Sequence, residues 1–365
     1  MEIEWNQMEN RMKLNLNDSS FVFDSEIVSL LLEIEEFKGS WKAYGNLAPE
    51  RLTELQRIAT IESVGSSTRI EGSRLSDAEV SRIMAGLSSK SFATRDEQEV
   101  AGYALLMNEI FESWEEMPLT ENIIKQMHSI LMRASDKDER HRGAYKTVEN
   151  NVAAFDKDGN QIGIVFETAS AFETPLCMEE LVEWTNLRLQ DQRLPALVVI
   201  GMFIVSFLAI HPFQDGNGRL SRALTILLLM RAGYVYVPYS SLESIVEASK
   251  QSYYVSLRAT QKTLQTSEPN WNIWLVFFLK TLVKQIRNLK GKVESEHLLR
   301  TMPEISLRII EQIQANGAMS IADLETLLKV NKYTLRDHLK RLTEEGYLIR
   351  VGSGRATKYN LKAFN

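Results

Sequence analysis

The sequence contains a single cysteine, Cys177, in 365 residues. An internal disulfide is therefore excluded, and a reducing cytoplasm is the compartment that we expect. A membrane-length apolar run is also missing, because the uncharged stretch Ala196–Ile210 has 15 residues, whereas a membrane-spanning helix needs about 20. Residues 1–10 carry three glutamates and no apolar core, so we expect no secretory signal. We also expect no membrane association, and a buried helix at Ala196–Ile210.

A strong excess of one charge is absent as well. The chain is 44% hydrophobic and 25% charged, with a net charge of −6, values typical of globular proteins. Its length predicts about two or three domains. Residues 303–365 contain ten Lys and Arg and seven Asp and Glu, which leaves −9 for the remainder. This difference indicates a separate C-terminal module, but a charge of +3 is too small to establish nucleic-acid binding.

Polar residues are concentrated in one stretch, 211–222, between the apolar runs Ala196–Ile210 and 223–230. Gly216 and Gly218 remove side chains where a backbone must approach a ligand closely. Leucines and alanines recur at helical spacing after this point, so a helix is expected to begin near Gly218. The free N–H groups and positive dipole at such a helix start form an anion site.

The charged side chains of this stretch suit phosphate chemistry. Arg219 and Arg222 are three residues apart, lie on one helix face and can each bind phosphate oxygens through two N–H groups. Asp215 can hold Mg²⁺, which needs few protein ligands when phosphates complete its coordination. His211 has an ordinary pKa near neutrality and could take a proton from an attacking hydroxyl. Together these groups predict phosphoryl or nucleotidyl transfer.

The same residues, HPFQDGNGRLSR, resemble the signature HxFx(D/E)GNGRxxR of the Fic-domain family at every specified position. The resemblance implies a mainly α fold, a helical bundle with a β-hairpin flap, and transfer of AMP from ATP to a Ser, Thr or Tyr hydroxyl of a target protein. It implies a catalytic base at His211, a Mg²⁺ ligand at Asp215, and nucleotide contacts from Glu71, Gly216, Asn217, Gly218, Arg219, Arg222, Tyr253 and Tyr254.

A second motif precedes this region at residues 67–72, Ser-Thr-Arg-Ile-Glu-Gly. Alone it indicates a helix end with Gly72 as the C-cap. Beside the signature it resembles the family's inhibitory motif, (S/T)xxxE(G/N), with Ser67, Glu71 and Gly72 at the specified positions. The resemblance implies that Glu71 pairs with Arg222, which then cannot bind the γ-phosphate.

A β-hairpin is predicted within residues 146–168, where β-branched residues flank an Asp-Gly turn at 156–160. It resembles the Fic flap, which covers the nucleotide and docks the target by strand pairing. The preceding residues 143–147 are similar to the family's G-x-Y/F-R-T with Lys146 in place of arginine, and residues 149–153 replace Q-N-W-I-G.

Aromatic rings outside the signature are assigned by position. Tyr253 and Tyr254 stand where relatives place tyrosines against adenosine, and we favour ligand contact for at least one over packing alone. His128 falls within an expected helix and receives no catalytic role.

The predicted organisation has three parts: an N-terminal helical region at 1–115, a Fic core at 116–290 and a winged-helix-like domain at 303–365. In the last, three helices and a strand pair present basic residues that could meet a DNA backbone. Packing of this module against proteins is an equal alternative.

Two functions from different classes remain. The first is a protein adenylyltransferase, acting on another protein or on itself. The second is a DNA-binding regulator that senses a nucleotide. Homodimer formation and other Fic-like reactions, namely transfer of UMP, phosphocholine or phosphate and removal of AMP, also remain open.

Overall fold

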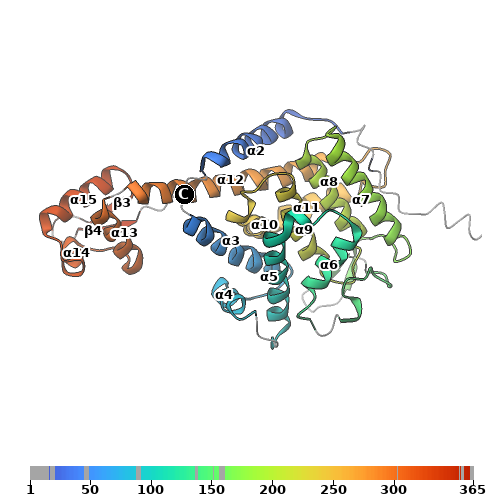
Figure 1. Ribbon diagram of the computed structural model, residues 1–365, viewed down its shortest axis with the longest axis horizontal. Helices are drawn as coiled ribbons and strands as arrows, with labels where there is room; N and C mark the ends of the chain where they lie inside the picture. Colours follow the sequence, from blue (N-terminus) through green and yellow to red (C-terminus); the bar gives the residue numbers. More distant parts are fainter. Residues whose placement is uncertain are drawn as a thin grey trace, which may run out of the picture. The chain divides into compact units, whose positions relative to one another are not determined.

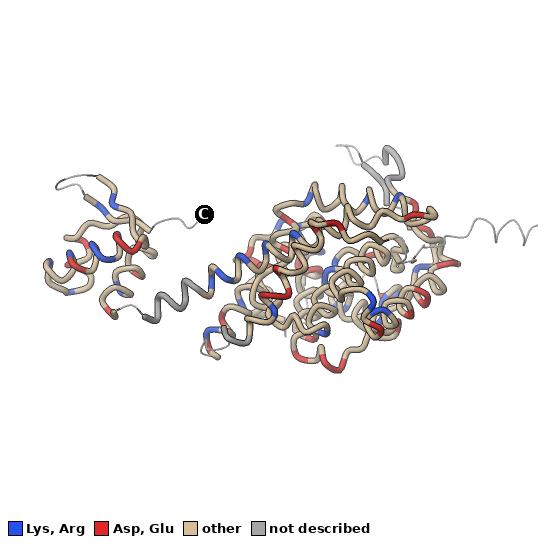
Figure 2. The backbone as a smooth tube through the Cα atoms, turned by 90° about the horizontal axis from the view of Figure 1, so that it is seen from above, with Lys and Arg blue, Asp and Glu red and all other residues tan. Residues whose placement is uncertain are grey.

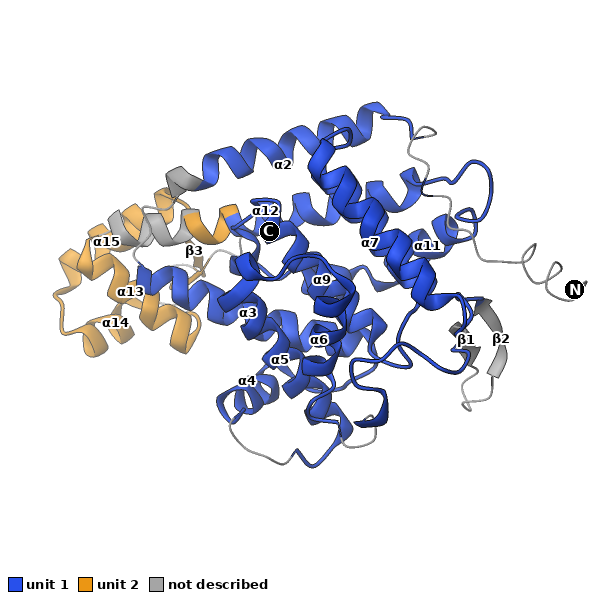
Figure 3. Cartoon of the chain, turned by 45° about the vertical axis from the view of Figure 1, so that its right-hand side comes forward, with its two compact units in different colours: residues 1–289 blue, residues 290–365 orange. Residues whose placement is uncertain are grey.

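The computed structural model describes residues 16, 21–44, 49–87, 92–135, 139–150, 152–155, 161–301, 303–352, 354 and 357–361. The chain divides into two compact units, Met1–Leu289 and Lys290–Asn365 (Figure 3). Both are predominantly helical, with one two-stranded antiparallel sheet each (Figure 1). Basic and acidic residues are interspersed along both units (Figure 2). The predicted mainly α fold is confirmed, and in the described part of the chain no helix combines the length and apolarity required to cross a bilayer.

The first unit is built mainly from helices, and the last of them, α12, continues past Leu289. They are α2 (Ser25–Tyr44), α3 (Pro49–Ile70), α4 (Asp77–Ala85), α5 (Arg95–Ser113), η2 (Trp114–Glu116), α6 (Glu121–Leu131), η3 (Glu139–His141), α7 (Thr174–Asp191), α8 (Ala196–Ile210), α9 (Asn217–Arg231), η4 (Val237–Tyr239), α10 (Leu242–Ala248), α11 (Lys250–Gln261) and α12 (Asn272–Thr301).

The centre of this unit is α8, which carries no charged side chain and is buried from Leu197 to Ile210. It packs against α7, α9 and α11. Trp274 Nε1 of α12 donates a hydrogen bond to Gly201 O at 2.7 Å. A side chain at Gly201 would collide with Leu275, so this glycine permits the close approach of α12. The prediction of a buried helix is confirmed.

Helices α4 and α5 begin at well-formed caps. Ser76 and Glu79 form a capping box at α4, and Thr94 and Glu97 form another at α5, which satisfies N–H groups at both helix starts. Helix α3 packs against α5, α9 and α10. Its last turn lies beside α9, because Arg222 of α9 donates a hydrogen bond to Ser67 O at 2.8 Å. Gly72, just beyond this turn, has a φ of 115°.

Helix α2 is anchored by aromatic rings and by one cation. The ring of Phe37 lies 5.8 Å from that of Trp41 and 4.9 Å from that of Tyr236. Lys38 Nζ donates to Ala232 O at 2.8 Å. A cation at this carbonyl, just past the last residue of α9, interacts favourably with the negative end of the helix dipole.

A hairpin joins α6 to α7. Its strands, β1 (Val152–Phe155) and β2 (Gln161–Phe166), pair antiparallel with Val152 opposite Phe166. The predicted hairpin is confirmed, and the predicted turn at 156–160 lies outside the described residues.

The second unit contains α13 (Glu304–Asn316), α14 (Ile321–Leu328), α15 (Lys332–Glu344), β3 (Leu348–Val351) and β4 (Lys358–Leu361). Ser320 caps α14 and Asn331 caps α15. The core is made of apolar side chains from all three helices and β3, among them Ile309, Leu324 and Leu339. The predicted winged helix-turn-helix is confirmed.

Candidate functional site

His211 follows the last residue of α8, where the chain turns with a φ of 55° and a ψ of 59°. Its Nδ1 lies 3.4 Å from Leu208 O. Since a carbonyl only accepts hydrogen bonds, this geometry assigns the proton to Nδ1 and leaves the lone pair on Nε2. Burial, and secondly the charge of Lys146, lower the pKa of His211 to about 4. The imidazole is therefore neutral at pH 7 and available as a base.

The turn between α8 and α9 is held by buried side chains. Asn217 accepts a hydrogen bond from Phe213 N–H at 2.9 Å and donates one to Phe213 O at 2.6 Å. His128 of α6 accepts from Gly143 N–H at 2.9 Å. Its other ring nitrogen must then carry the proton, and it lies 3.1 Å from Asp215 O. His128 also stacks on the Phe213 ring at 3.9 Å, so it supports the turn rather than facing a ligand.

Helix α9 carries two guanidinium nitrogens that find no hydrogen-bond partner within the described part of the chain. Arg219 Nε and Arg222 Nη1 are buried without a hydrogen-bond partner among the described residues. Gly216, at the N-cap, has a φ of 80°. Buried donors without partners are costly, so an anionic ligand would fit this point, as the sequence predicts for a phosphate chain.

Glu71 occupies the same region from the side of α3. Its Oε1 accepts a hydrogen bond from Arg222 Nη2 at 2.8 Å. Arg222 also donates from Nε to Ser67 Oγ at 2.9 Å and from Nη2 to Ser67 O at 2.8 Å. A side chain at Gly218 would clash with the Glu71 carboxylate. The carboxylate thus lies against the backbone where an anionic ligand would approach.

Asp215 is surrounded by a small charge network. Its Oδ2 accepts from Arg95 Nη2 at 3.0 Å and lies 3.4 Å from Arg219 Nη2. Glu99 accepts from Arg95 Nε at 2.8 Å and lies 3.6 Å from Arg219 Nη1. Arg95 and Glu99 could not be recognised as site residues from the sequence, because their spacing of four residues on a helix is that of an ordinary surface ion pair.

The residues around Asp215 suit a metal that is shared with a ligand. No group of three or more His, Cys, Asp or Glu capable of holding a metal occurs in the described ranges. Asp215 itself offers one carboxylate with a side chain 36% exposed. Mg²⁺ usually takes one or two carboxylates and completes its shell with water and phosphate oxygens. The donor set therefore fits Mg²⁺ bound together with a phosphate ligand.

These groups line one cavity of about 300 Å³. Of the predicted site residues, it brings together Glu71, His211, Asp215, Gly216, Asn217, Gly218, Arg219, Arg222, Tyr253 and Tyr254. Ser67 lies behind Arg222, and Gly72 is exposed and does not line the cavity. The lining also includes Phe166 at the end of β2 and Arg258, neither of which the sequence analysis selected.

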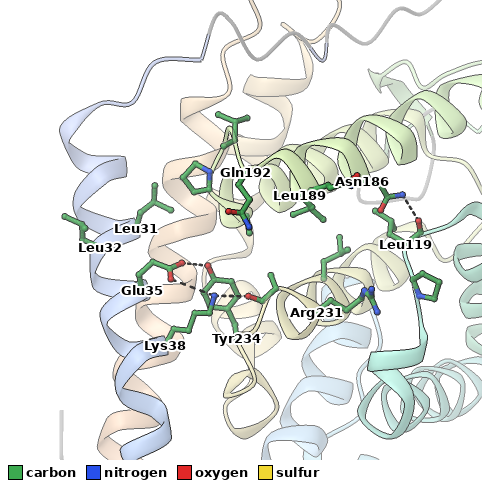
Figure 4. Close-up of a pocket in the computed structure, with 17 residues that line it drawn as sticks. Leu31, Leu32, Glu35, Lys38, Leu119, Asn186, Leu189, Gln192, Arg231 and Tyr234 are labelled. Atoms are coloured by element: carbon green, nitrogen blue, oxygen red, sulfur yellow. Dashed lines mark hydrogen bonds and ion pairs between the residues drawn. The ribbon is translucent and has the colours of Figure 1, made fainter.

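A larger cavity of about 810 Å³ lies away from these groups, lined by α2, α7 and the end of α9 (Figure 4). Glu35 accepts a hydrogen bond from the Tyr234 hydroxyl. Lys38 lies over the Tyr234 ring at 4.2 Å and donates to a backbone carbonyl. Arg231 donates to two backbone carbonyls at 3.1 and 3.0 Å. Because these charged groups are engaged in structural contacts, we place the chemistry in the smaller cavity.

Comparison with known proteins finds two domain families in the chain. Residues 118–229 match the family model "Fic/DOC family", and residues 302–349 match "Winged helix-turn-helix DNA-binding". A Fic family protein from Desulfovibrio desulfuricans is 23% identical with a TM-score of 0.61, over 95% of this chain and 98% of that one. A Fic domain containing signalling protein from Bacteroides thetaiotaomicron is 24% identical with a TM-score of 0.54, over 73% and 97%. A Fic protein from C. elegans is 18% identical with a TM-score of 0.58, over 74% and 73%. These likenesses concern the fold.

Proposed function

We propose that this chain, which contains a Fic domain and a C-terminal winged helix-turn-helix, is a protein adenylyltransferase that moves AMP from ATP to a hydroxyl side chain of a target protein. The observation that carries the proposal is the pair of buried, unpartnered guanidinium donors on Arg219 and Arg222 in the cavity that His211 also lines. An anion site and a neutral base in one cavity are the two elements that nucleotidyl transfer to a hydroxyl requires.

In the proposed reaction, His211 Nε2 takes the proton of the target hydroxyl as the oxygen attacks the α-phosphorus. The bond from the α-phosphorus to the bridging oxygen breaks, and pyrophosphate leaves. The backbone N–H groups at the start of α9 stabilise the α-phosphate, and Arg219 with Arg222 steadies the leaving group. Mg²⁺ at Asp215 would neutralise phosphate charge when bound. Tyr253 and Tyr254 would pack against the adenosine.

We also propose that the state described is inhibited. With Arg222 Nε and Nη2 held by Ser67 and Glu71, these two nitrogens are not free to bind the terminal phosphate. ATP that binds beside the Glu71 carboxylate would have its phosphates misplaced for in-line attack. The parts of the chain would then be an N-terminal helical region at 1–115 with the inhibitory motif at 67–72, a Fic core at 116–290 with its flap at 146–168, and a winged-helix-like domain at 303–365.

The test is label transfer from α-³²P-ATP with Mg²⁺ in wild type, Glu71→Gly and the double variant Glu71→Gly/His211→Ala. Labelling of the chain itself or of lysate proteins by Glu71→Gly, lost in the double variant, is the expected result. Absence of labelling in every variant, with α-labelled UTP, GTP and CTP also inactive, would refute nucleotidyl transfer.

The second candidate is a DNA-binding regulator, which the exposed face of α15 favours. Lys332, Tyr333, Arg336 and Lys340 are all exposed on this helix, and such a face suits phosphate and base contacts. A gel shift that weakens steeply with salt and survives His211→Ala would support it. No shift at low salt would remove it.

A further inference from the structure

The backbone around His211 is held by the foot of the hairpin. Four consecutive carbonyls, 210–213, each accept a hydrogen bond from Lys146 or Asn150. Lys146 donates from Nζ to Ile210 O at 3.1 Å and from its backbone N–H to Pro212 O at 2.8 Å. Asn150 Nδ2 donates to His211 O at 3.2 Å and to Phe213 O at 2.6 Å. The Ile210 carbonyl belongs to the last turn of α8 and has no acceptor role within its own helix, and the other three carbonyls lie in the turn beyond it. The donors of Lys146 and Asn150 satisfy all four.

Lys146 is a buried cation with a full set of acceptors. It is 3% exposed, and besides Ile210 O its Nζ donates to Asn150 Oδ1 at 2.7 Å and to Thr168 Oγ1 at 2.9 Å. Burial lowers the pKa of Lys146 to about 8, which leaves it mainly protonated at pH 7. Three acceptors for three N–H groups make this a fixed junction rather than a mobile surface lysine.

Thr168, just after β2, joins this group of hydrogen bonds from the other end of the hairpin. Its hydroxyl lies within hydrogen-bond distance of Asn150 Oδ1, at 3.1 Å. Asn150 precedes β1 and Thr168 follows β2, so the two feet of the hairpin meet at Lys146. We call Lys146, Asn150 and Thr168 the stem cluster.

The conformation of His211 explains why such support is required. A non-glycine residue in the left-handed region is strained, because its β-carbon comes close to backbone atoms. Such a conformation persists where surrounding contacts determine it. The stem cluster supplies donors on both sides of the His211 α-carbon, at the carbonyls of residues 210 and 211.

We propose that the stem cluster consists of positioning residues that hold His211 in the geometry of a base and join the hairpin to it as one mechanical unit. The catalytic part of this inference rests on the proposed function, whereas the mechanical part does not. A target strand that pairs with the hairpin would thereby be placed in a fixed relation to the His211 imidazole.

The chain offers a matched control for Asn150. Gln285 of α12 also uses a side-chain amide to donate to two backbone carbonyls, Val237 O at 3.3 Å and Ser240 O at 2.6 Å. It lies in the same unit but outside the cavity. Asn150→Ala and Gln285→Ala therefore remove the same kind of contact from two different turns.

The experiment measures amide hydrogen exchange by mass spectrometry in the full chain and kinetics in a Glu71→Gly background. Asn150→Ala should raise exchange about tenfold in peptides covering 208–217 and leave peptides covering 234–242 unchanged, whereas Gln285→Ala should do the reverse. Asn150→Ala should also lower kcat by about 10- to 100-fold with the KM for ATP within about twofold. Lys146→Arg should retain much more activity than Lys146→Met.

Unchanged exchange at 208–217 in Asn150→Ala would overturn the mechanical unit, and an equal loss of kcat in Gln285→Ala would overturn the positioning role. If Asn150→Ala does not fold, Thr168→Val removes the hydroxyl junction at similar side-chain volume and is read by the same criteria. If the Glu71→Gly protein transfers no nucleotide, the proposed function fails, but the exchange measurement still decides whether the stem cluster holds the turn.

Discussion

Replacing Glu71 by alanine should activate AMP transfer, because it frees Arg222 for the phosphate chain. The pair joins Glu71 Oε1 to Arg222 Nη2 at 2.8 Å, with side chains 32% and 7% exposed. A hydrogen bond between charged groups in such a setting is worth roughly 1.5–3 kcal/mol. If that energy opposes the active arrangement, its loss corresponds to roughly 10- to 150-fold in rate at subsaturating ATP.

A second change should activate the protein further. Arg222 also donates to Ser67 Oγ at 2.9 Å, a contact that Glu71→Ala leaves in place. Removing it with Ser67→Ala should contribute roughly another 0.5–1.5 kcal/mol, or about 2- to 10-fold. The double variant should therefore exceed either single variant, and Ser67→Ala alone should activate less than Glu71→Ala.

The assay is initial-rate labelling with α-³²P-ATP, with Glu247→Ala as the matched control. Glu247 of α10 pairs with Arg69 of α3 at 2.7 Å, with side chains 30% and 23% exposed. Like the Glu71–Arg222 pair, this ion pair joins the α3 region to another helix. The control should not activate. Equal activation by Glu247→Ala would mean that loosening α3 suffices, and no activation by Glu71→Ala would refute the competition for Arg222.

Three further outcomes follow from other groups. Because the pKa of His211 is lowered to about 4 and its neutral form is the base, kcat/KM should fall only as pH drops through about 4 to 5; an acid limb near 6.5 would contradict the buried environment. Arg95 Nη2 lies 3.0 Å from Asp215 Oδ2 and would compete with Mg²⁺ for this carboxylate. Arg95→Ala should therefore lower the Mg²⁺ concentration for half-maximal ATP binding by about 2- to 5-fold, as expected when a surface pair worth up to about 1 kcal/mol is removed. Calorimetric titration measures this concentration, and an increase would refute the competition between Arg95 and Mg²⁺. Leu339 is fully buried in the second unit, so Leu339→Ala should destabilise that unit by about 2–5 kcal/mol; calorimetric unfolding should show its transition shifted, and an unshifted transition would contradict the packing.

The signature residues were predicted to lie together, and the structure places them around one cavity. The pairing of Glu71 with Arg222 joins residues 151 positions apart, and only the family resemblance pointed to it. The start of α9 could be predicted from Gly216 and Gly218, because glycine and helix spacing leave a pattern in the sequence. The hairpin and the winged helix were predictable for the same reason.

The supporting contacts could not be predicted, because most of them end on backbone carbonyls. Asn150 and Lys146 donate to the main chain of residues 210–213. Every residue has a backbone carbonyl, so the sequence does not mark which carbonyls accept these hydrogen bonds. His128 offered a histidine in an apolar helix, which is typical of packing, and its contact with Asp215 O depends on how α6 meets the turn. Arg95 reaches Asp215 across 120 residues.

The contact between Lys38 and Ala232 O has a consequence for truncated versions of the protein. Helix α9 is held by a carboxylate from residue 71 at its start and by an ammonium from residue 38 just past its end. Deleting residues 1–72 would remove both charges at once. It would also remove the Phe37 and Trp41 rings that pack around Tyr236. A shortened core would thus lose both the inhibitory Glu71 carboxylate and the Lys38 contact that stabilises the end of the same helix. Low activity in such a fragment would not argue against inhibition by Glu71, and point substitutions in the full chain separate the two effects.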